Sequence, residues 1–167
     1  MLGKVGGDAV LSPRGRAYGR RLAEFVNTTL RPRIAGVWTS TLRRTVETAA
    51  AIAAPKERLA ELNELGSGRC EGLTYEEIAE FYPAEFAARD ADKFHYRYPG
   101  GERFPSFDRV ASNDRRILLS NPSGESYADL VQRVRPVVER LKGLDNIFII
   151  AHQVGFHPAT SFARLLS

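Results

Sequence analysis

The sequence of 167 residues has few cysteines and no long apolar runs. Its single cysteine, Cys70, excludes an intramolecular disulfide and a zinc site built from several cysteines, so we expect a reducing compartment. The longest apolar runs, such as residues 147–151, are far too short to span a bilayer. The first residues carry no apolar stretch of the kind that signal peptides need. We therefore expect a cytoplasmic protein without a membrane partner.

Several catalytic and ligand-binding motifs are also missing. The N-terminal glycines lack the G-x-x-x-x-G-K-[ST] spacing of a phosphate-binding loop, and neither a G-x-S-x-G elbow nor an H-E-x-x-H zinc pair occurs. Three scattered histidines do not suggest a metal site, so we expect no metal and no cofactor. The excess of 24 Lys and Arg over 20 Asp and Glu is spread along the chain. This net charge of +4 slightly favours an anionic small ligand and argues against a nucleic-acid partner.

Alternating helix and strand signals are typical of an α/β domain with a largely parallel sheet. Buried strands are predicted over residues 34–39 and 146–151, while residues 59–65 fit either a strand or a loop. Pro32 is predicted to end the first helix. Side chains that can cap a helix precede four apolar periodic segments, at Ser12, Ser40-Thr41, Thr74 and Ser126.

Ligands of such folds collect at the carboxyl ends of strands, where this sequence places Arg44 and His152. An arginine beside the free N–H groups of a helix start can bind a phosphate oxygen, although spacing alone favours a solvated surface role for Arg44. His152 could bind phosphate, carry a proton, or be a hydrogen-bonded structural histidine. Spacing alone favours ordinary surface roles for the other polar candidates, which are Glu64, Tyr75, Arg89 and Lys93.

Two stretches, residues 11–15 (LSPRG) and 37–49 (VWTSTLRRTVETA), resemble the histidine phosphatase, or phosphoglycerate mutase-like, superfamily. Further stretches narrow the resemblance to the fructose-2,6-bisphosphatase domain of the bifunctional 6-phosphofructo-2-kinase/fructose-2,6-bisphosphatase family; they are residues 62–64, 70–78, 89–93, 96–99, 124–127 and 152–153. The resemblance implies a partial domain over residues 1–153, with an unrelated insert at about 103–123 and an unmatched tail over 154–167. It implies a three-layer α/β/α sandwich that lacks the family's first central strand and C-terminal strands.

The resemblance also implies an activity, the hydrolysis of the 2-phosphate of fructose 2,6-bisphosphate through a phosphohistidine to give fructose 6-phosphate. Arg44 would bind the transferred phosphoryl group, His152 would hold and neutralise it, and Glu64 would protonate the leaving sugar oxygen. The sugar and its 6-phosphate would be held by Tyr75, Arg89, Lys93, Tyr127 and Gln153, with Gly6 near the substrate.

The sequence departs from the family at the nucleophile, which is a histidine in an Arg-His-Gly triplet. None of its three histidines, His95, His152 and His157, lies in such a triplet, and His157 stands where the family has another phosphate-binding arginine. Because a covalent intermediate needs its nucleophile, we expect the chain as written to be inactive or nearly so. The alternatives are a non-catalytic remnant that binds sugar phosphate and a histidine phosphatase of broader specificity. A homodimer stays open for the intact parent.

Overall fold

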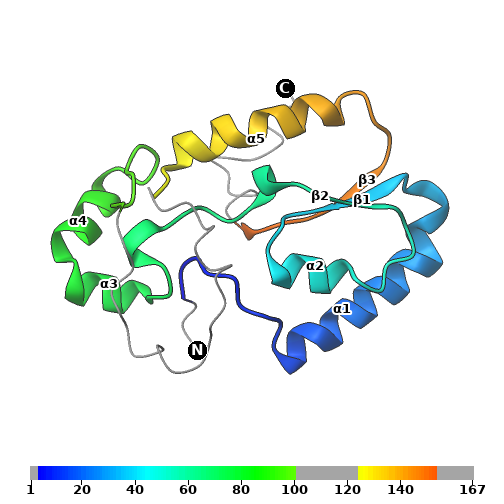
Figure 1. Ribbon diagram of the computed structural model, residues 1–167, viewed down its shortest axis with the longest axis horizontal. Coiled ribbons are helices and arrows are strands. Elements are labelled where there is room, and N and C mark those ends of the chain that lie inside the picture. The colour runs from blue at the N-terminus through cyan, green and yellow to red at the C-terminus, as the bar shows by residue number, and fades with distance from the viewer. Residues whose placement is uncertain (1–3, 101–123, 154–167) are drawn as a thin grey trace. The chain divides into compact units, whose positions relative to one another are not determined.

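The computed structural model describes residues 4–100 and 124–153 (Figure 1). The expected insert at about 103–123 and the tail over 154–167, which contains His157, lie outside the described residues. The chain divides into two compact units. Unit 1 comprises residues 1–7 and 65–132, and unit 2 comprises residues 8–64 and 133–167. We describe each unit by itself.

Unit 2 contains a parallel sheet of three strands in the order β2-β1-β3. The strands are β1 (Gly36–Thr39), β2 (Lys56–Arg58) and β3 (Ile147–Ile150). The central strand β1 places Val37 opposite Lys56 on one side and opposite Phe148 on the other. The predicted strands before Ser40 and before His152 and the parallel sheet are therefore confirmed. The ambiguous segment forms a short 3-10 helix over Ala60–Leu62.

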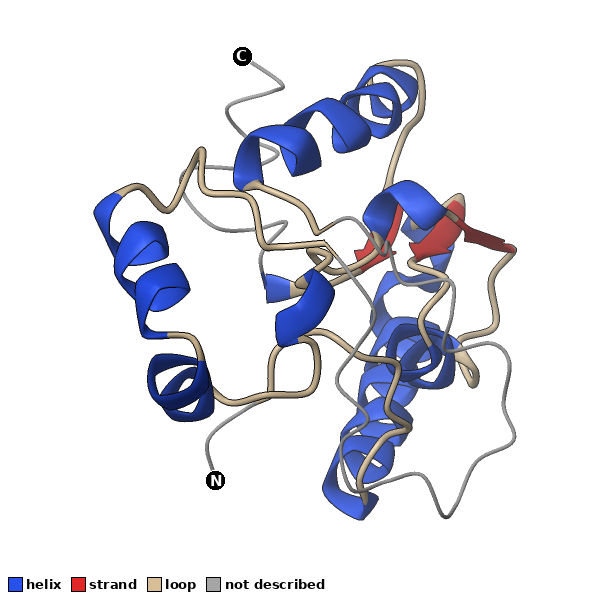
Figure 2. Cartoon of the chain, turned by 60° about the vertical axis from the view of Figure 1, so that its left-hand side comes forward, coloured by secondary structure: helices blue, strands red, loops and turns tan. Residues whose placement is uncertain are grey.

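Helices lie on both faces of this sheet, and Figure 2 shows the three strands grouped among them. Helices α1 (Pro13–Phe25) and α2 (Arg43–Ala49) cover one face, where Val37 packs into an apolar core. On the other face, the end of α5 (Tyr127–Leu141) brings the Arg140 guanidinium to 4.6 Å from the ring centroid of Trp38. Unit 2 therefore has the layered arrangement expected of an α/β/α sandwich.

The predicted starts of three helices are confirmed by their capping bonds. The Ser12 hydroxyl accepts the N–H of Gly15 at the start of α1. Thr74 forms a complete capping box at the start of α3 (Tyr75–Phe81). At the start of α5, Ser126 accepts the backbone N–H of Asp129, whose carboxylate accepts the N–H of Ser126. Each bond satisfies a backbone group that the first helical turn leaves without an intrahelical partner.

Two details of the helix predictions are wrong. The first helix ends at Phe25 rather than at Pro32, because the chain continues as a π-helical turn over Val26–Leu30, where Asn27 bonds the backbone of Ala51 and Ala53. Its predicted apolar face is also only partly buried, since Tyr18 and Phe25 are 62% and 52% exposed. Apolar spacing identifies the helix but does not measure how wide its covered face is.

Unit 1 is mainly helical in its described part. Besides α3 it contains α4 (Pro83–Ala91), a helix that the sequence reading leaves unassigned and that begins with Pro83 in its first turn. Near the N-terminus, Val5 exchanges backbone bonds with Gly72 and Leu73, at 2.7 and 2.8 Å. These bonds hold Val5 against the loop that follows residue 65. None of the helices in the described ranges is long and apolar enough to cross a membrane.

Candidate functional site

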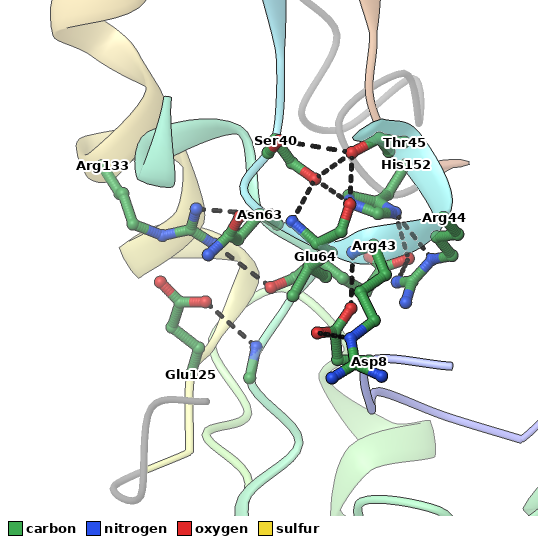
Figure 3. Close-up of polar contacts among 12 residues, drawn as sticks. Asp8, Ser40, Arg43, Arg44, Thr45, Asn63, Glu64, Glu125, Arg133 and His152 are labelled. Carbon is green, nitrogen blue, oxygen red and sulfur yellow. Dashed lines mark hydrogen bonds and ion pairs between the residues drawn. The ribbon is translucent and has the colours of Figure 1, made fainter. Parts of the chain in front are cut away.

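Three residues predicted to be catalytic lie together in unit 2 (Figure 3). Arg44 is in the first turn of α2, Glu64 follows the 3-10 helix, and His152 lies two residues after β3. The Arg44 Nε donates to Nδ1 of His152 at 3.2 Å. The Glu64 Oε2 lies 3.9 Å from Arg44 Nη2 and also 3.9 Å from His152 Nδ1. The fold thus gathers an arginine cation, a carboxylate and a histidine near the carboxyl ends of β1 and β3.

A cleft of about 500 Å³ opens beside this cluster, within unit 2. Its polar lining includes Arg44, Glu64, His152 and the exposed Gln153, while Leu22 and Phe148 are among its apolar lining residues. Arg44 and Glu64 keep about a quarter of their side chains exposed, whereas His152 is almost fully buried. A cleft of this size can hold a small ligand such as a sugar phosphate.

The Ser40 hydroxyl holds the far side of the His152 ring and is itself bonded to the Thr45 hydroxyl, and the sequence predicted no role at the site for either residue. The Nε2 of His152 lies 2.8 Å from Ser40 Oγ, which lies 2.7 Å from Thr45 Oγ1. Ser40 is fully buried, and Thr45 is 3% exposed. This contact also explains a wrong prediction. Ser40-Thr41 does not open α2, which begins at Arg43 without a side-chain cap.

Arg133, on α5, is a second residue that the sequence reading missed. Its Nη1 donates to the carbonyls of Glu61, Asn63 and Ala60, at 2.7, 3.2 and 3.2 Å. Its Nη2 donates to the Asn63 carbonyl at 3.3 Å. The guanidinium therefore satisfies several carbonyls at the end of the 3-10 helix and fixes the backbone that carries Glu64. Its spacing within an amphipathic helix gave no signal of this role.

The charges around His152 set its protonation state. Burial lowers the pKa of His152 to about 3, with the positive charges of Arg44 and Arg133 acting in the same direction. The imidazole is therefore neutral at pH 7 when the site holds no anion. A neutral imidazole next to an arginine can accept a proton once an anion offsets the positive charge.

Unit 1 gathers a separate group of predicted binding residues. Arg89 Nη2 donates to the Tyr75 hydroxyl at 3.1 Å, and the guanidinium lies 4.6 Å from the Tyr75 ring centroid. The buried Nε of Arg89 has no hydrogen-bond partner within the described part of the chain. Burial lowers the pKa of Arg89, but Tyr98, Tyr75 and Tyr127 outweigh it, so that the pKa is raised. Tyr98, whose pKa burial raises to about 12, was not among the predicted site residues.

The remaining predicted binding residues have simpler surroundings. Lys93 is largely exposed and pairs with Asp90, its Nζ lying 3.2 Å from the carboxylate. Gly6 has a φ of +65°, and a Cβ added there would lie 2.8 Å from Cγ of Glu71. Glycine is the residue that this turn accepts without strain. Cys70 is fully buried, and burial raises the pKa of its thiol, which makes it a poor nucleophile.

Among residues 4–100 and 124–153, no three His, Cys, Asp or Glu side chains are grouped so that they could hold a metal ion. The charged and titratable groups that meet near His152 are two arginines, Arg44 and Arg133, and the carboxyl group of Glu64. These are the groups that bind phosphoryl oxygens and supply a proton to a leaving group.

Relatives with similar sequences are bifunctional enzymes. The chain is 46% identical over 153 residues to 6-phosphofructo-2-kinase/fructose-2,6-bisphosphatase of Gallus gallus, covering 92% of this chain and 27% of that protein. It is 42% identical to isoform 4 of Homo sapiens, covering 92% of this chain and 28% of the relative. The chain therefore spans about a quarter of the length of these relatives.

Solved structures share the fold at low sequence identity. The alpha-ribazole phosphatase of Shigella flexneri superposes with a TM-score of 0.67 at 20% identity, covering 98% of this chain and 75% of that one. YhfR of Bacillus stearothermophilus gives a TM-score of 0.61 at 23% identity, covering 99% and 76%. The family model described as "Histidine phosphatase superfamily (branch 1)" matches residues 4–121. With its parallel sheet and the Arg44 cluster at the strand ends, this chain belongs to the histidine phosphatase superfamily.

Proposed function

We propose that this chain is part of a fructose-2,6-bisphosphate 2-phosphatase domain, a type of domain that releases the 2-phosphate and leaves fructose 6-phosphate. The observation that carries the proposal is the meeting of Arg44, Glu64 and His152 in unit 2. The substrate is taken from the names of relatives that are 40–46% identical. The modest positive charge of the chain suits such an anionic substrate.

Each of the three residues has a role that its surroundings support. The planar guanidinium of Arg44 can bind two phosphoryl oxygens at once. His152 can donate a second hydrogen bond after it takes up a proton. The Glu64 carboxyl lies 3.9 Å from both partners, so an oxygen that leaves the phosphoryl group between them could receive its proton.

We further propose that the 167-residue chain binds sugar phosphate without turning it over. The sequence contains no Arg-His-Gly triplet. Both ring nitrogens of His152 are engaged, one by Ser40 and the other by Arg44, so neither is presented as a free nucleophile. His95 is exposed and paired with Asp92. Formation of a phosphohistidine would need a nucleophile that these residues do not provide.

The 6-phosphate and the sugar are assigned to the second group of residues. In unit 1, Tyr75, Arg89, Lys93 and Tyr127 would bind them, with Gly6 near the substrate. The cation Arg89, held by a tyrosine hydroxyl and with one buried N–H unpartnered in the described chain, supports an anion site in unit 1. A histidine phosphatase of broader specificity would need no such second phosphate contact, which is why we favour the bisphosphatase.

Calorimetric titration with fructose 6-phosphate, together with a phosphate-release assay on fructose 2,6-bisphosphate, tests the proposal. Loss of a charge-assisted hydrogen bond in Arg44→Gln should weaken binding at least about tenfold. Arg43→Gln is the matched control, because Arg43 is the adjacent residue and its side chain pairs with Asp8 instead. We expect the chain to bind fructose 6-phosphate and to release no phosphate from fructose 2,6-bisphosphate. Only the Arg44 variant should lose affinity. Equal losses in both variants, or no binding at all, would contradict the proposed function. Equal affinity for unrelated sugar phosphates would favour the broader phosphatase.

A further inference from the structure

The directions of the hydrogen bonds beside His152 follow from the groups that can only accept or only donate. Thr45 Oγ1 lies 2.9 Å from the Leu42 carbonyl and 3.3 Å from the Ser40 carbonyl, so its hydrogen points to a carbonyl. Thr45 must then accept the hydrogen of the Ser40 hydroxyl at 2.7 Å. With its hydrogen used, Ser40 Oγ accepts from its remaining neighbours, the Leu42 N–H at 3.2 Å and His152 Nε2 at 2.8 Å.

The other side of the imidazole gives the same answer independently. Arg44 Nε lies 3.2 Å from His152 Nδ1 and can only donate. Nδ1 must therefore be the nitrogen without a hydrogen, and Nε2 the nitrogen that carries it. The opposite tautomer would place two N–H groups against each other at Arg44. Both ends of the chain of bonds thus select the neutral Nε2–H form.

We infer that Ser40, supported by Thr45, is a positioning residue that fixes His152 as the Nε2–H tautomer and thereby reserves Nδ1 for a phosphoryl oxygen. The inference deepens the proposed function and rests on it for the nature of the ligand. Nδ1 is the nitrogen that faces the two groups given phosphate-binding and acid roles, since Arg44 donates to it and Glu64 lies 3.9 Å away. Ser40 and Thr45 face the opposite edge of the ring (Figure 3).

Binding of a phosphate dianion changes the protonation of one nitrogen only. The Arg44 guanidinium turns its N–H groups to the phosphate oxygens, and Nδ1 takes one proton from solvent and donates it in a hydrogen bond to a third oxygen. Nε2 keeps its hydrogen throughout and continues to donate it to Ser40 Oγ, so the ring does not have to turn. Among the described residues, the charged groups near the ring are Arg44 on α2 and Glu64, and Arg133 on α5 acts on it through its charge. A bound dianion offsets the two cations that disfavour imidazolium in the empty site.

Nitrogen NMR of imidazole-labelled protein reads the tautomer directly, without any ligand. In the natural chain we expect His152 to show a protonated Nε2 and an unprotonated Nδ1 at pH 7. In Ser40→Ala we expect the Nδ1–H form to appear, and the affinity for inorganic phosphate to fall about tenfold because the ring loses its anchor. Thr45→Val should act in the same direction. Thr45→Ser, which keeps the hydroxyl, should restore both the tautomer and the affinity.

Ser12→Ala is the matched control, because it removes a serine hydroxyl that caps α1 and does not contact the ring. It should lower stability while leaving the His152 spectrum and the phosphate affinity unchanged. If Ser40→Ala does not fold, the comparison of Thr45→Val with Thr45→Ser provides the test. An Nδ1–H tautomer in the natural chain, or unchanged spectra and affinities in both the Ser40 and Thr45→Val variants, would overturn the inference. A correct tautomer in a chain that binds no fructose 6-phosphate would instead contradict only the proposed function.

Discussion

His152 combines deep burial with contacts to both ring nitrogens, and at the scale of single residues this decides its chemistry. Its position directly after a buried strand made it a candidate, as did that of Arg44 after β1, but the roles of both residues were predicted from the resemblance to the histidine phosphatases. Ser40, Thr45 and Arg133 could not be identified in this way. Their roles come from contacts between segments far apart in the chain, such as Ser40 with His152, which neither periodicity nor capping preference encodes.

The lowered pKa of His152 predicts how stability depends on pH. The unfolded chain binds a proton with a pKa near 6.5, whereas the folded chain does so only near 3, so the unfolded state carries more protons between these values. The contribution of the neutral His152 imidazole to the unfolding free energy is fully present above about pH 6.5 and is lost as the pH falls toward 3. The slope is at most about 1.4 kcal/mol for each pH unit.

Urea unfolding between pH 8 and 4 measures this dependence, with His152→Gln as the reference. Comparison with this reference separates the contribution of His152 to the pH dependence from the contributions of carboxylates such as Asp92 and Asp129, whose hydrogen bonds lower their pKa values. We expect the difference in unfolding free energy between the two proteins to shrink as the pH falls below 6.5. A difference that stays constant or grows on acidification would show that the folded imidazole is not neutral.

Lys93 offers a residue-scale test of the sugar-phosphate assignment, because the chain contains a close match for it. Lys93 pairs with Asp90 and Lys142 with Glu139, both three residues apart, and the two lysines are similarly exposed. Lys93→Met should weaken fructose 6-phosphate binding about fivefold or more, by loss of one phosphate contact. Lys142→Met should leave binding unchanged, as measured by calorimetry. Equal affinities in the two variants would remove Lys93 from the proposed site.

At the scale of elements, capping chemistry was the most reliable guide to where helices begin. It located the starts of α1, α3 and α5 because their cap residues bond only to their own helices. It was wrong at Ser40, whose hydroxyl bonds His152 and Thr45 instead. Helix α4 went unassigned, although Pro83 in its first turn is a common helix start. Local rules therefore hold where a side chain has no tertiary partner.

Arg133 shows how one helix positions a functional segment. We expect Arg133→Met to lower the unfolding free energy by about 1–3 kcal/mol, because the carbonyls of Glu61 and Asn63 lose their donor. It should also raise the pKa of His152, since Arg133 contributes to lowering it. Chemical denaturation and NMR titration of His152 measure the two effects.

Arg140→Met is the control for this prediction, because Arg140 lies on the same helix, pairs with Glu57 and covers the Trp38 ring, but is not among the charges that lower the pKa of His152. It should cost about 1 kcal/mol and leave the pKa of His152 in place. If both variants shifted that pKa equally, the effect of Arg133 would be a general loosening of α5 rather than a local contact.

At the scale of the whole molecule, alternating helix and strand signals were sufficient to predict a parallel α/β fold. These signals could not predict the strand order β2-β1-β3, because the order depends on which apolar faces meet after the chain has crossed the sheet. The same holds for the division into two units, in which residues 65–132 separate two segments that pack together. The chemistry follows from this arrangement, since Arg44, Glu64 and His152 come from both segments of unit 2.

The most direct test of the central claim is phosphorus NMR of the 167-residue chain mixed with fructose 2,6-bisphosphate. We predict that the phosphate resonances shift and broaden on binding and that no inorganic phosphate accumulates, because we propose Arg44 and His152 as phosphoryl-binding residues and the sequence has no Arg-His-Gly triplet to supply the nucleophile. Steady appearance of inorganic phosphate would contradict the absence of turnover. Unchanged resonances at a millimolar concentration of the chain would contradict the claim that these residues form a phosphate site.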